Sequence, residues 1–588
     1  MLPLLNIKNI TVEFPESESS EPALQELSFE LKRGEMLAVV GESGSGKSVM
    51  SLTLMNLLSK TARVKQGSIS FSPDGKNEIE LLGMEEKEFR TYRGNQLAMI
   101  FQEPMTSLNP VITCGTQLCE PLMLHKKLNR RDAKSAALLL FEKVQLPEPE
   151  RVFKKYPHQL SGGQRQRVMI AMAISCNPSV LICDEPTTAL DVRVQKTILD
   201  LLKSLLHSEN MGMIFITHDL GLVADMADRA LVMLRGRVVE SGLVNEMFVH
   251  PKHPYTRGLL MCRPSLHLKG ERLPVVSDFL DNNLSGFSEH VFGLSLQEKS
   301  GETIKNGSLL NGSKNISGAA PEILLKVHGL HLRYSSGKSW TGREKHWVDA
   351  IKDIDFEVYK GETLGVVGES GSGKTTLGRA ILGLNKPLHG SILFGGKELL
   401  TMGKSELIEF RRNIQIVFQD PYSSLNPRMM IGPAISEPLK VHDSLGKLDR
   451  KEKVLELLNQ VDLKPEHFNR YPHAFSGGQR QRIVIARALA LNPRFVVFDE
   501  SVSALDVSVQ AQVLNLVNDL KKNFGFTAIF ISHDLSVIRY LCDRVMVMEK
   551  GKIVESGNVE TVYLNPKTDY TRSLIEAIPG KGLKPNKI

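Results

Sequence analysis

Two short stretches of this sequence combine glycines with a lysine and a hydroxyl residue in the pattern that binds phosphate. GESGSGKS lies at residues 41–48 and GESGSGKT at residues 368–375, each directly after an apolar run and before a sequence typical of a helix. Glycines let backbone N–H groups converge on phosphate oxygens, the lysine reaches the β and γ phosphates, and the last residue ligates magnesium. We therefore expect two phosphate loops. The residues expected to bind the nucleotide there are Gly41, Ser43, Gly44, Ser45, Gly46, Lys47 and Ser48, and Gly368, Ser370, Gly371, Ser372, Gly373, Lys374, Thr375 and Thr376.

Two further apolar runs each end in an acidic pair. Asp184 and Glu185 follow VLIC, and Asp499 and Glu500 follow FVVF. We expect each aspartate to hold Mg²⁺ and each glutamate to polarise an attacking water. A helix cap or a surface acid after a strand is the alternative, and the paired phosphate loops argue against it.

The acidic pairs differ in the residue that follows them. Pro186 follows the first pair, whereas Ser501 follows the second. Because a serine lacks the fixed φ of proline, we expect a looser turn beside the second glutamate. Hydrolysis is still expected at both sites, since both keep the lysine, the aspartate and the glutamate.

The stretch SGGQ occurs twice, each time before a helix-forming run. A serine and two glycines at a helix N-terminus leave N–H groups free, and together with the helix dipole these favour an anion. A second phosphate receptor in one domain makes chemical sense if it serves a nucleotide held by another copy. The residues concerned are Ser161, Gly162, Gly163 and Gln164, and Ser476, Gly477, Gly478 and Gln479.

These landmarks recur in one order, so the chain is an internal duplication. From the SGGQ serine to the aspartate is 23 residues in both halves, and from that aspartate to the histidine of THDL or SHDL is 34 in both. Apolar strands alternate with helices around a polar helical middle. This alternation of strands and helices predicts an α/β fold in which each half has a mainly parallel sheet and an inserted helical subdomain.

The segment between the repeats is rich in small polar residues. Residues 301–320 contain ten Gly, Ser or Asn, a composition typical of a tether. We therefore predict a first ATPase domain at residues 1–265, a flexible linker at 266–322 and a second ATPase domain at 323–588.

Taken together, the motifs resemble those of ATP-binding cassette (ABC) ATPase domains over nearly the whole chain outside the linker. The resemblance implies two tandem P-loop NTPase domains, each with a RecA-like core sheet, an antiparallel β region and a helical subdomain. It also implies a head-to-tail sandwich in which SGGQ of one half completes the ATP held by the phosphate loop of the other.

The resemblance implies roles for further residues. Gln102 and Gln419 would sense Mg²⁺ and the attacking water, and His218 and His533 would contact the γ-phosphate. The aspartates of TALD and SALD would join the two sites, and an aromatic residue early in each half would stack on adenine. These last residues are Asp191 and Asp506, and Phe14 and Tyr334; packing in the core is the competing interpretation of the aromatic pair.

Within the family, the tails are informative. PKHPYTRGLL at residues 251–260 and PKTDYTRSLI at residues 566–575 place a tyrosine 37 residues after each histidine. With the SLNP stretches after the glutamines, this resembles the fused form of the dipeptide, oligopeptide, nickel and glutathione importer ATPases. Such a protein would use ATP and Mg²⁺, contact two integral membrane permease subunits at the cytoplasmic face of the cell membrane, and work with an extracytoplasmic solute-binding protein. The transported solute is left open.

Composition supports a globular protein but does not decide its function. The 588 residues are 41% hydrophobic and 24% charged, with a net charge of +7. No apolar run reaches the ~20 residues that span a bilayer, and the start does not resemble a secretory signal. The six cysteines form no CxxC pair, so we expect neither a disulfide framework nor a zinc site.

The alternative is a tandem ABC ATPase that acts on ribosomes or nucleic acid. Residues 270–320 hold four Lys or Arg against six Asp or Glu. A net charge of −2 makes a poor phosphate-binding arm, so no nucleic-acid partner is expected.

Overall fold

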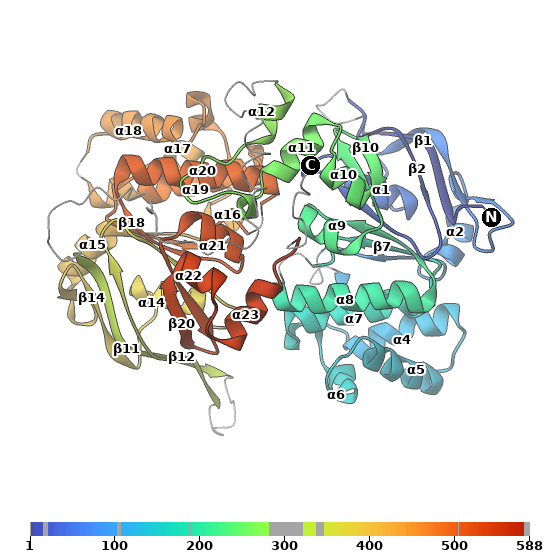
Figure 1. Ribbon diagram of the computed structural model, residues 1–588, viewed down its shortest axis with the longest axis horizontal. Coiled ribbons are helices and arrows are strands. Elements are labelled where there is room, and N and C mark those ends of the chain that lie inside the picture. Colours follow the sequence, from blue (N-terminus) through green and yellow to red (C-terminus); the bar gives the residue numbers. More distant parts are fainter. Residues whose placement is uncertain are drawn as a thin grey trace, which may run out of the picture. The chain divides into compact units, whose positions relative to one another are not determined.

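The computed structural model describes residues 2–15, 21–102, 107–187, 190–281, 322–336, 346–443, 445–503 and 505–580. Two compact units emerge from its internal packing (Figure 1). The first unit holds residues up to Cys262, and the second unit holds most of the chain from Arg263 on. Of the predicted linker, residues 282–321 lie outside the described part of the chain, and the predicted domain boundaries stay predictions.

The core of the first unit is a six-stranded sheet in which five neighbouring strands are parallel and one edge strand is antiparallel. Its three central apolar strands are buried along their whole length, as expected for a sheet covered on both faces. In spatial order the strands are β10 (Arg237–Leu243), β9 (Arg229–Leu234), β3 (Met36–Val40), β8 (Gly212–Ile216), β7 (Val180–Asp184) and β6 (Leu97–Ile100).

A second sheet of the first unit is antiparallel and has four strands. Its apolar residues join a core with those of β3 and β7. The strands in order are β2 (Leu24–Leu31), β1 (Leu5–Glu13), β4 (Arg63–Phe71) and β5 (Ile79–Glu80).

Helices of the first unit follow the core strands and form the inserted subdomain. In Figure 1, α4, α5 and α6 gather beside α7, and they bury a shared apolar core with the sheet. The helices are α1 (Lys47–Leu54), α2 (Glu86–Tyr92), α4 (Cys114–His125), α5 (Arg130–Lys143), α6 (Pro149–Lys154), η1 (Pro157–Gln159), α7 (Gly162–Ile174), α8 (Val192–Glu209), α9 (Leu220–Met226), α10 (Val244–Val249) and α11 (Pro254–Met261).

The second unit repeats this architecture strand for strand. Its core sheet consists of β16 (Ile414–Val417), β17 (Phe495–Asp499), β18 (Thr527–Ile531), β13 (Thr363–Val367), β19 (Arg544–Glu549) and β20 (Lys552–Asn558). Its antiparallel sheet consists of β12 (His346–Tyr359), β11 (Ile323–Ser336), β14 (His389–Phe394) and β15 (Lys397–Glu398). The hairpin from β4 to β5 uses residues 72–78, whereas that from β14 to β15 turns at residues 395–396, so the first unit has the longer hairpin.

The helices of the second unit also repeat those of the first. They are α14 (Lys374–Ile381), η3 (Leu399–Thr401), α15 (Lys404–Asn413), α16 (Pro421–Ser424), α17 (Ile431–His442), α18 (Lys447–Gln460), η4 (Pro465–Asn469), η5 (Pro472–Ala474), α19 (Gly477–Leu489), α20 (Val507–Phe524), α21 (Leu535–Leu541), α22 (Val559–Leu564) and α23 (Asp569–Glu576). The predicted α/β class is thereby confirmed, with a core sheet, an antiparallel region and a helical subdomain in each unit.

Residues 263–281 pack within the second unit, through η2 (Pro264–Leu266), α12 (Val276–Leu280) and the stretch between them. The backbone N–H of Leu273 donates to Asn515 Oδ1 at 2.9 Å, and Asn515 Nδ2 donates to the carbonyl of Leu273 at 2.8 Å. The Tyr540 hydroxyl donates to the carbonyl of Glu271 at 2.6 Å. Asn515 and Tyr540 are buried, so this segment satisfies polar groups inside the unit.

Across the described residues, no helix is both long and apolar enough to cross a bilayer.

Candidate functional site

Both phosphate loops fold around their lysine. Lys47 begins α1 and donates to the carbonyls of Gly41 and Glu42 at 2.7 and 2.8 Å. Lys374 begins α14 and makes the same bonds with the carbonyls of residues 368 and 369, at 2.8 and 2.9 Å. Both lysines are buried, and burial lowers the pKa of Lys47. The loop thus holds an ammonium group at a helix N-terminus, where it can meet phosphate.

The first glycine of each loop is required by its surroundings. Gly41 has φ 155°, and a Cβ there would lie 2.3 Å from the carbonyl oxygen of Met233. Gly368 has φ 153°, and a Cβ would lie 2.2 Å from the carbonyl oxygen of Met548. Any side chain would therefore push the loop away from the strand beside it.

The predicted magnesium ligands lie together in each unit. Thr375 Oγ1 donates to Asp499 Oδ1 at 3.1 Å, and Ser48 lies near enough to Asp184 to favour its charged form. Burial raises the pKa of Asp184, and the neighbouring Glu185 raises it further. Burial likewise raises the pKa of Asp499 against the opposing effect of the Thr375 hydrogen bond. Carboxylate and hydroxyl oxygens beside a phosphate loop are the donors that Mg²⁺ prefers, so this set fits the ion.

In the first unit the predicted glutamine and histidine converge on the glutamate. Gln102 Nε2 donates to Glu185 Oε2 at 2.9 Å, and His218 Nδ1 lies 3.3 Å from Glu185 Oε1. Burial opposes a charged imidazole, but the hydrogen bond and the charge of Glu185 outweigh it and raise the pKa of His218.

The second unit has the same arrangement. Gln419 Nε2 donates to Glu500 Oε2 at 2.8 Å, and His533 Nδ1 lies 3.7 Å from the same oxygen. Lys374 Nζ lies 3.8 Å from Glu500 Oε1. Although burial opposes the carboxylate, the nearby His533 and the charge of Lys374 lower the pKa of Glu500. This glutamate is therefore held as an acceptor, the form that a general base needs.

Both glutamates have a left-handed backbone. The φ of Glu185 is 46° and that of Glu500 is 48°, a conformation that is unfavourable for a non-glycine residue by about 1–3 kcal/mol. Each backbone N–H donates to a neighbouring strand at 3.0 Å, to the carbonyl of Ile216 or Ile531. The two turns thus share this backbone despite the change from Pro186 to Ser501, and a looser second turn stays a prediction. Strain reproduced at the same residue of both units indicates a functional constraint.

Ser501 itself is buried, and its hydroxyl has no hydrogen-bond partner within the described part of the chain. Replacing it with the proline of the first unit removes this unsatisfied group and restricts the unfolded chain. We expect Ser501→Pro to stabilise the protein by about 1 kcal/mol. Urea unfolding measures the change, and Pro186→Ser is the matched reverse substitution, expected to destabilise. A loss of stability in Ser501→Pro would show that the second turn needs the serine.

The SGGQ stretches form helix caps as expected. Ser161 caps α7 by accepting from the backbone N–H of Gln164 at 3.3 Å, and the Gln164 side chain accepts from the N–H of Ser161 at 3.2 Å. Ser476 and Gln479 make the same reciprocal pair at the start of α19, at 3.3 and 3.1 Å. The capping box orders the first turn, and the other N–H groups of that turn stay available to an anion.

The remaining predicted residues lie at element ends. Asp191 caps α8 by accepting from the N–H of Val194 at 3.0 Å, and Asp506 directly precedes α20. Phe14 follows β1, is half-buried and packs against the core. Tyr334 lies in β11, is 44% exposed and accepts a hydrogen bond from Asn385 at 2.8 Å. Adenine stacking stays a prediction for both aromatic residues.

Sequence reasoning missed a contact between each tail and its phosphate loop. The hydroxyl of Tyr255, on α11, accepts from the backbone N–H of Glu42 at 3.0 Å. The hydroxyl of Tyr570, on α23, accepts from the N–H of Glu369 at 3.0 Å. Tyr255 is completely buried, and burial raises its pKa. The equal spacing of the two tyrosines from the histidines was the available signal.

Removing either hydroxyl leaves a loop N–H unsatisfied. We expect Tyr255→Phe and Tyr570→Phe each to destabilise the protein by about 1–3 kcal/mol and to weaken nucleotide binding. Urea unfolding and nucleotide titration measure the two effects. Tyr156→Phe and Tyr471→Phe are matched controls, because these tyrosines are 38% and 37% exposed. Equal stability of all four variants would contradict the expectation.

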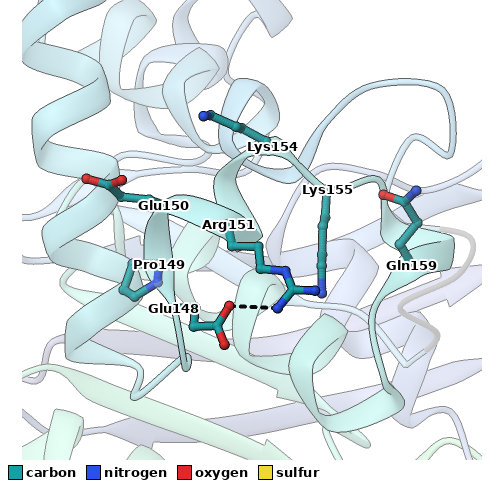
Figure 2. Close-up of a pocket in the computed structure, with 7 residues that line it drawn as sticks. All are labelled: Glu148, Pro149, Glu150, Arg151, Lys154, Lys155 and Gln159. Atoms are coloured by element: carbon teal, nitrogen blue, oxygen red, sulfur yellow. Dashed lines mark hydrogen bonds and ion pairs between the residues drawn. The ribbon is translucent and has the colours of Figure 1, made fainter.

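A pocket in the helical subdomain of the first unit contains none of the predicted site residues. It lies around α6, where Arg151 pairs with Glu148 at 2.9 Å (Figure 2). Its lining residues are Glu148, Pro149, Glu150, Arg151, Lys154, Lys155 and Gln159.

Comparison with known proteins identifies relatives of the whole chain. The ABC transporter family matches residues 24–188 and 351–503, and the family described as oligopeptide/dipeptide transporter, C-terminal region, matches residues 239–278. The glutathione import ATP-binding protein GsiA of Pectobacterium atrosepticum is 45% identical over 98% of this chain and 90% of its own length. The protein of the same name from Escherichia coli (strain K12) is 46% identical over 98% of this chain and 89% of its own length.

A solved dimeric ATP-binding cassette in a post-hydrolysis state, bound to ADP and Pi, is 28% identical and aligns with 40% of this chain and 98% of its own, with a TM-score of 0.36.

The family matches and the two relatives confirm the resemblance seen in the motifs. The family match falls once in each half and covers both phosphate loops and both acidic pairs. The relatives align with both halves at once. The chain therefore belongs to the ABC transporter family, and its two units are ATPase cassettes.

Proposed function

We propose that this chain is the ATP-hydrolysing subunit of an importer for peptides or related small solutes, with glutathione as the first candidate. The observation that carries the proposal is the alignment of 98% of the chain with proteins named for glutathione import. The match of residues 239–278 to the oligopeptide/dipeptide transporter C-terminal region supports the same class.

The geometry supports hydrolysis in each unit. Lys47 and Lys374 would neutralise the β and γ phosphates. Glu185 and Glu500 would accept a proton from the attacking water, and Gln102 and Gln419 orient these carboxylates through their amide groups. His218 and His533 would place a donor near the γ-phosphate. Ser48 with Asp184, and Thr375 with Asp499, would hold Mg²⁺, which supplies charge neutralisation to the phosphates.

ATP would power transport because it binds the closed arrangement of the cassettes more tightly than the open one. The capped starts of α7 and α19 present N–H groups to an anion, and we infer that each completes the nucleotide bound to the other cassette. A closed arrangement that binds ATP more tightly than an open one shifts the equilibrium towards closure, and hydrolysis reverses it. This cycle would act on two integral membrane permeases at the cytoplasmic face, with an extracytoplasmic binding protein that supplies the solute.

The test is recovery and reconstitution of the complex. We expect the tagged chain, extracted from native membranes in mild detergent, to copurify with two multi-spanning permeases and a solute-binding protein. The same complex in liposomes should take up labelled glutathione or a competing peptide only with ATP present. A doubly substituted Glu185→Gln, Glu500→Gln complex is the control. Copurification of ribosomal proteins instead would support the alternative class and overturn the proposal.

A further inference from the structure

The antiparallel sheet of the second unit contains a cluster of histidines and aspartates that the ATPase site does not use. His331 lies on β11, Asp349 and Asp353 lie on β12, and His389 lies on β14. One ligand atom each from His331, Asp353 and His389 lie within 4.8 Å of one another. The rings of the two histidines are 4.7 Å apart between centroids.

The hydrogen bonds of His389 determine which of its ring nitrogens can bind a cation. Its Nδ1 lies 3.2 Å from the carbonyl oxygen of Gly329, so Nδ1 carries the hydrogen. In the neutral ring Nε2 then has a lone pair, and this atom lies 3.4 Å from Asp353 Oδ1. A backbone carbonyl that fixes the tautomer of a histidine is the usual outer partner of a metal ligand. Two acceptors face each other here, which favours a cation between them.

His331 is in a similar position between two carboxylates. Its Nδ1 lies 3.3 Å from Asp353 Oδ1, and its Nε2 lies 3.2 Å from Asp349 Oδ1. A neutral imidazole has only one N–H to donate, so one carboxylate faces a lone pair. His331 is only 16% exposed, which limits how far water can replace a partner. The cluster of His331, Asp353 and His389 therefore offers two imidazole nitrogens and one carboxylate around one point, and Asp349 lies at the other ring nitrogen of His331.

The backbone brings these side chains together through irregular sheet geometry. His331 and His389 are direct cross-strand partners. Asp353 has φ 48° and interrupts the register between β11 and β12. Gly390, with φ 101°, allows the close approach of β14, since a Cβ there would lie 2.4 Å from the carbonyl oxygen of Gly329. Bulges commonly re-aim side chains at functional positions.

The first unit has the same backbone with different side chains. Thr11 pairs with Gln66 as His331 pairs with His389, and Glu26 has φ 50° where Asp353 has 48°. There Thr11 Oγ1 accepts from Gln66 Nε2 at 3.3 Å and from the N–H of Glu26 at 3.2 Å. This sheet thus folds with an ordinary neutral network. The two imidazoles of the second unit are not needed to form the bulge.

We propose that His331, His389 and Asp353, assisted by Asp349, form a binding site for one divalent transition-metal ion of the Zn²⁺, Co²⁺ or Ni²⁺ class. Two imidazole nitrogens and carboxylate oxygens suit this class. The ion would join β11, β12 and β14, three strands of one sheet. None of these four residues belongs to the phosphate loop or to the predicted magnesium ligands of the second unit.

The test uses the full chain, freed of metal with a chelator and kept in excess Mg²⁺ to occupy the ATPase sites. Calorimetric titration with Zn²⁺ should show one ion bound per chain, and Co²⁺ should give visible absorption without thiolate charge-transfer bands. The variant His331→Thr, His389→Gln, Asp353→Glu takes the residues of the first unit, which fit this backbone. We expect it to fold, as measured by circular dichroism, and to lose the ion.

Single substitutions and a control complete the test. His331→Thr alone should weaken Zn²⁺ binding by at least about tenfold. His328→Lys is the matched control, since His328 is an exposed histidine of the same strand that pairs with Asp355, and the first unit has Lys8 at its position. It should bind Zn²⁺ like the unchanged chain. Failure of the unchanged chain to bind Zn²⁺, or equal binding by the triple variant, would overturn the proposal.

Discussion

Glu185→Gln and Glu500→Gln should lower ATP turnover by equal factors, at least about twofold each, and together by about 100-fold or more. A general base contributes roughly 10²–10⁴ to the rate, and the amide of glutamine cannot accept the proton. Equality is expected because the two glutamates share their φ and the same glutamine contact, at 2.9 and 2.8 Å. Phosphate release by the purified chain and by the permease complex measures the turnover.

Matched controls for this experiment lie on the helical subdomains. Glu142→Gln on α5 and Glu456→Gln on α18 change exposed glutamates on corresponding helices of the two units. Neither should alter turnover. If one of the two active-site substitutions left the rate untouched, the cassettes would be unequal despite their matching geometry.

Lys47→Met and Lys374→Met should each abolish tight nucleotide binding at one site. A hydrogen bond to a charged group contributes about 1.5–3 kcal/mol, and 1.4 kcal/mol is tenfold in affinity. Loss of the contacts to two phosphates therefore predicts a fall of about 100-fold or more. Methionine keeps most of the buried volume, so the fold should persist. Titration with a fluorescent ATP analogue should find one site in each single variant.

The exposed lysines that follow the same helices serve as controls. Lys60→Met and Lys386→Met remove a positive charge at the surface and should leave two sites of unchanged affinity. An unchanged affinity in Lys47→Met would instead show that the loop binds phosphate through its backbone alone.

Most of the ATPase site could be predicted from the sequence because its residues lie in short segments. A strand, a loop and a helix start place Lys47 at the N-terminus of α1, and the end of β7, another buried strand of the same sheet, places Asp184 nearby. Such local geometry is set by glycine conformation and by strand ends. The apolar runs likewise identified the parallel strands, since buried strands need continuous apolar residues.

The missed features depend on tertiary contacts between distant residues. The hydroxyl of Tyr255 bonds to a loop about 200 residues earlier, and spacing alone does not name its partner. His331, Asp353 and His389 meet only because bulges adjust three strands, and bulges have no reliable sequence signal. The packing of residues 263–281 was missed because composition describes only the average of a segment. The docking of this segment depends on the backbone groups of Leu273 and Glu271, which bond to Asn515 and Tyr540.

The packing of residues 263–281 determines where the chain could be divided into two stable halves. The family match that begins at residue 239, in the first unit, continues through this segment as far as residue 278, yet by packing the segment belongs to the second unit. A second half expressed from residue 323 would lack the partners of Asn515 and Tyr540, each at a penalty of about 1–3 kcal/mol. One that begins at Arg263 would keep them. If the gene were divided into two products, we therefore expect the more stable second product to begin at or before Arg263, well before the duplicated motifs resume.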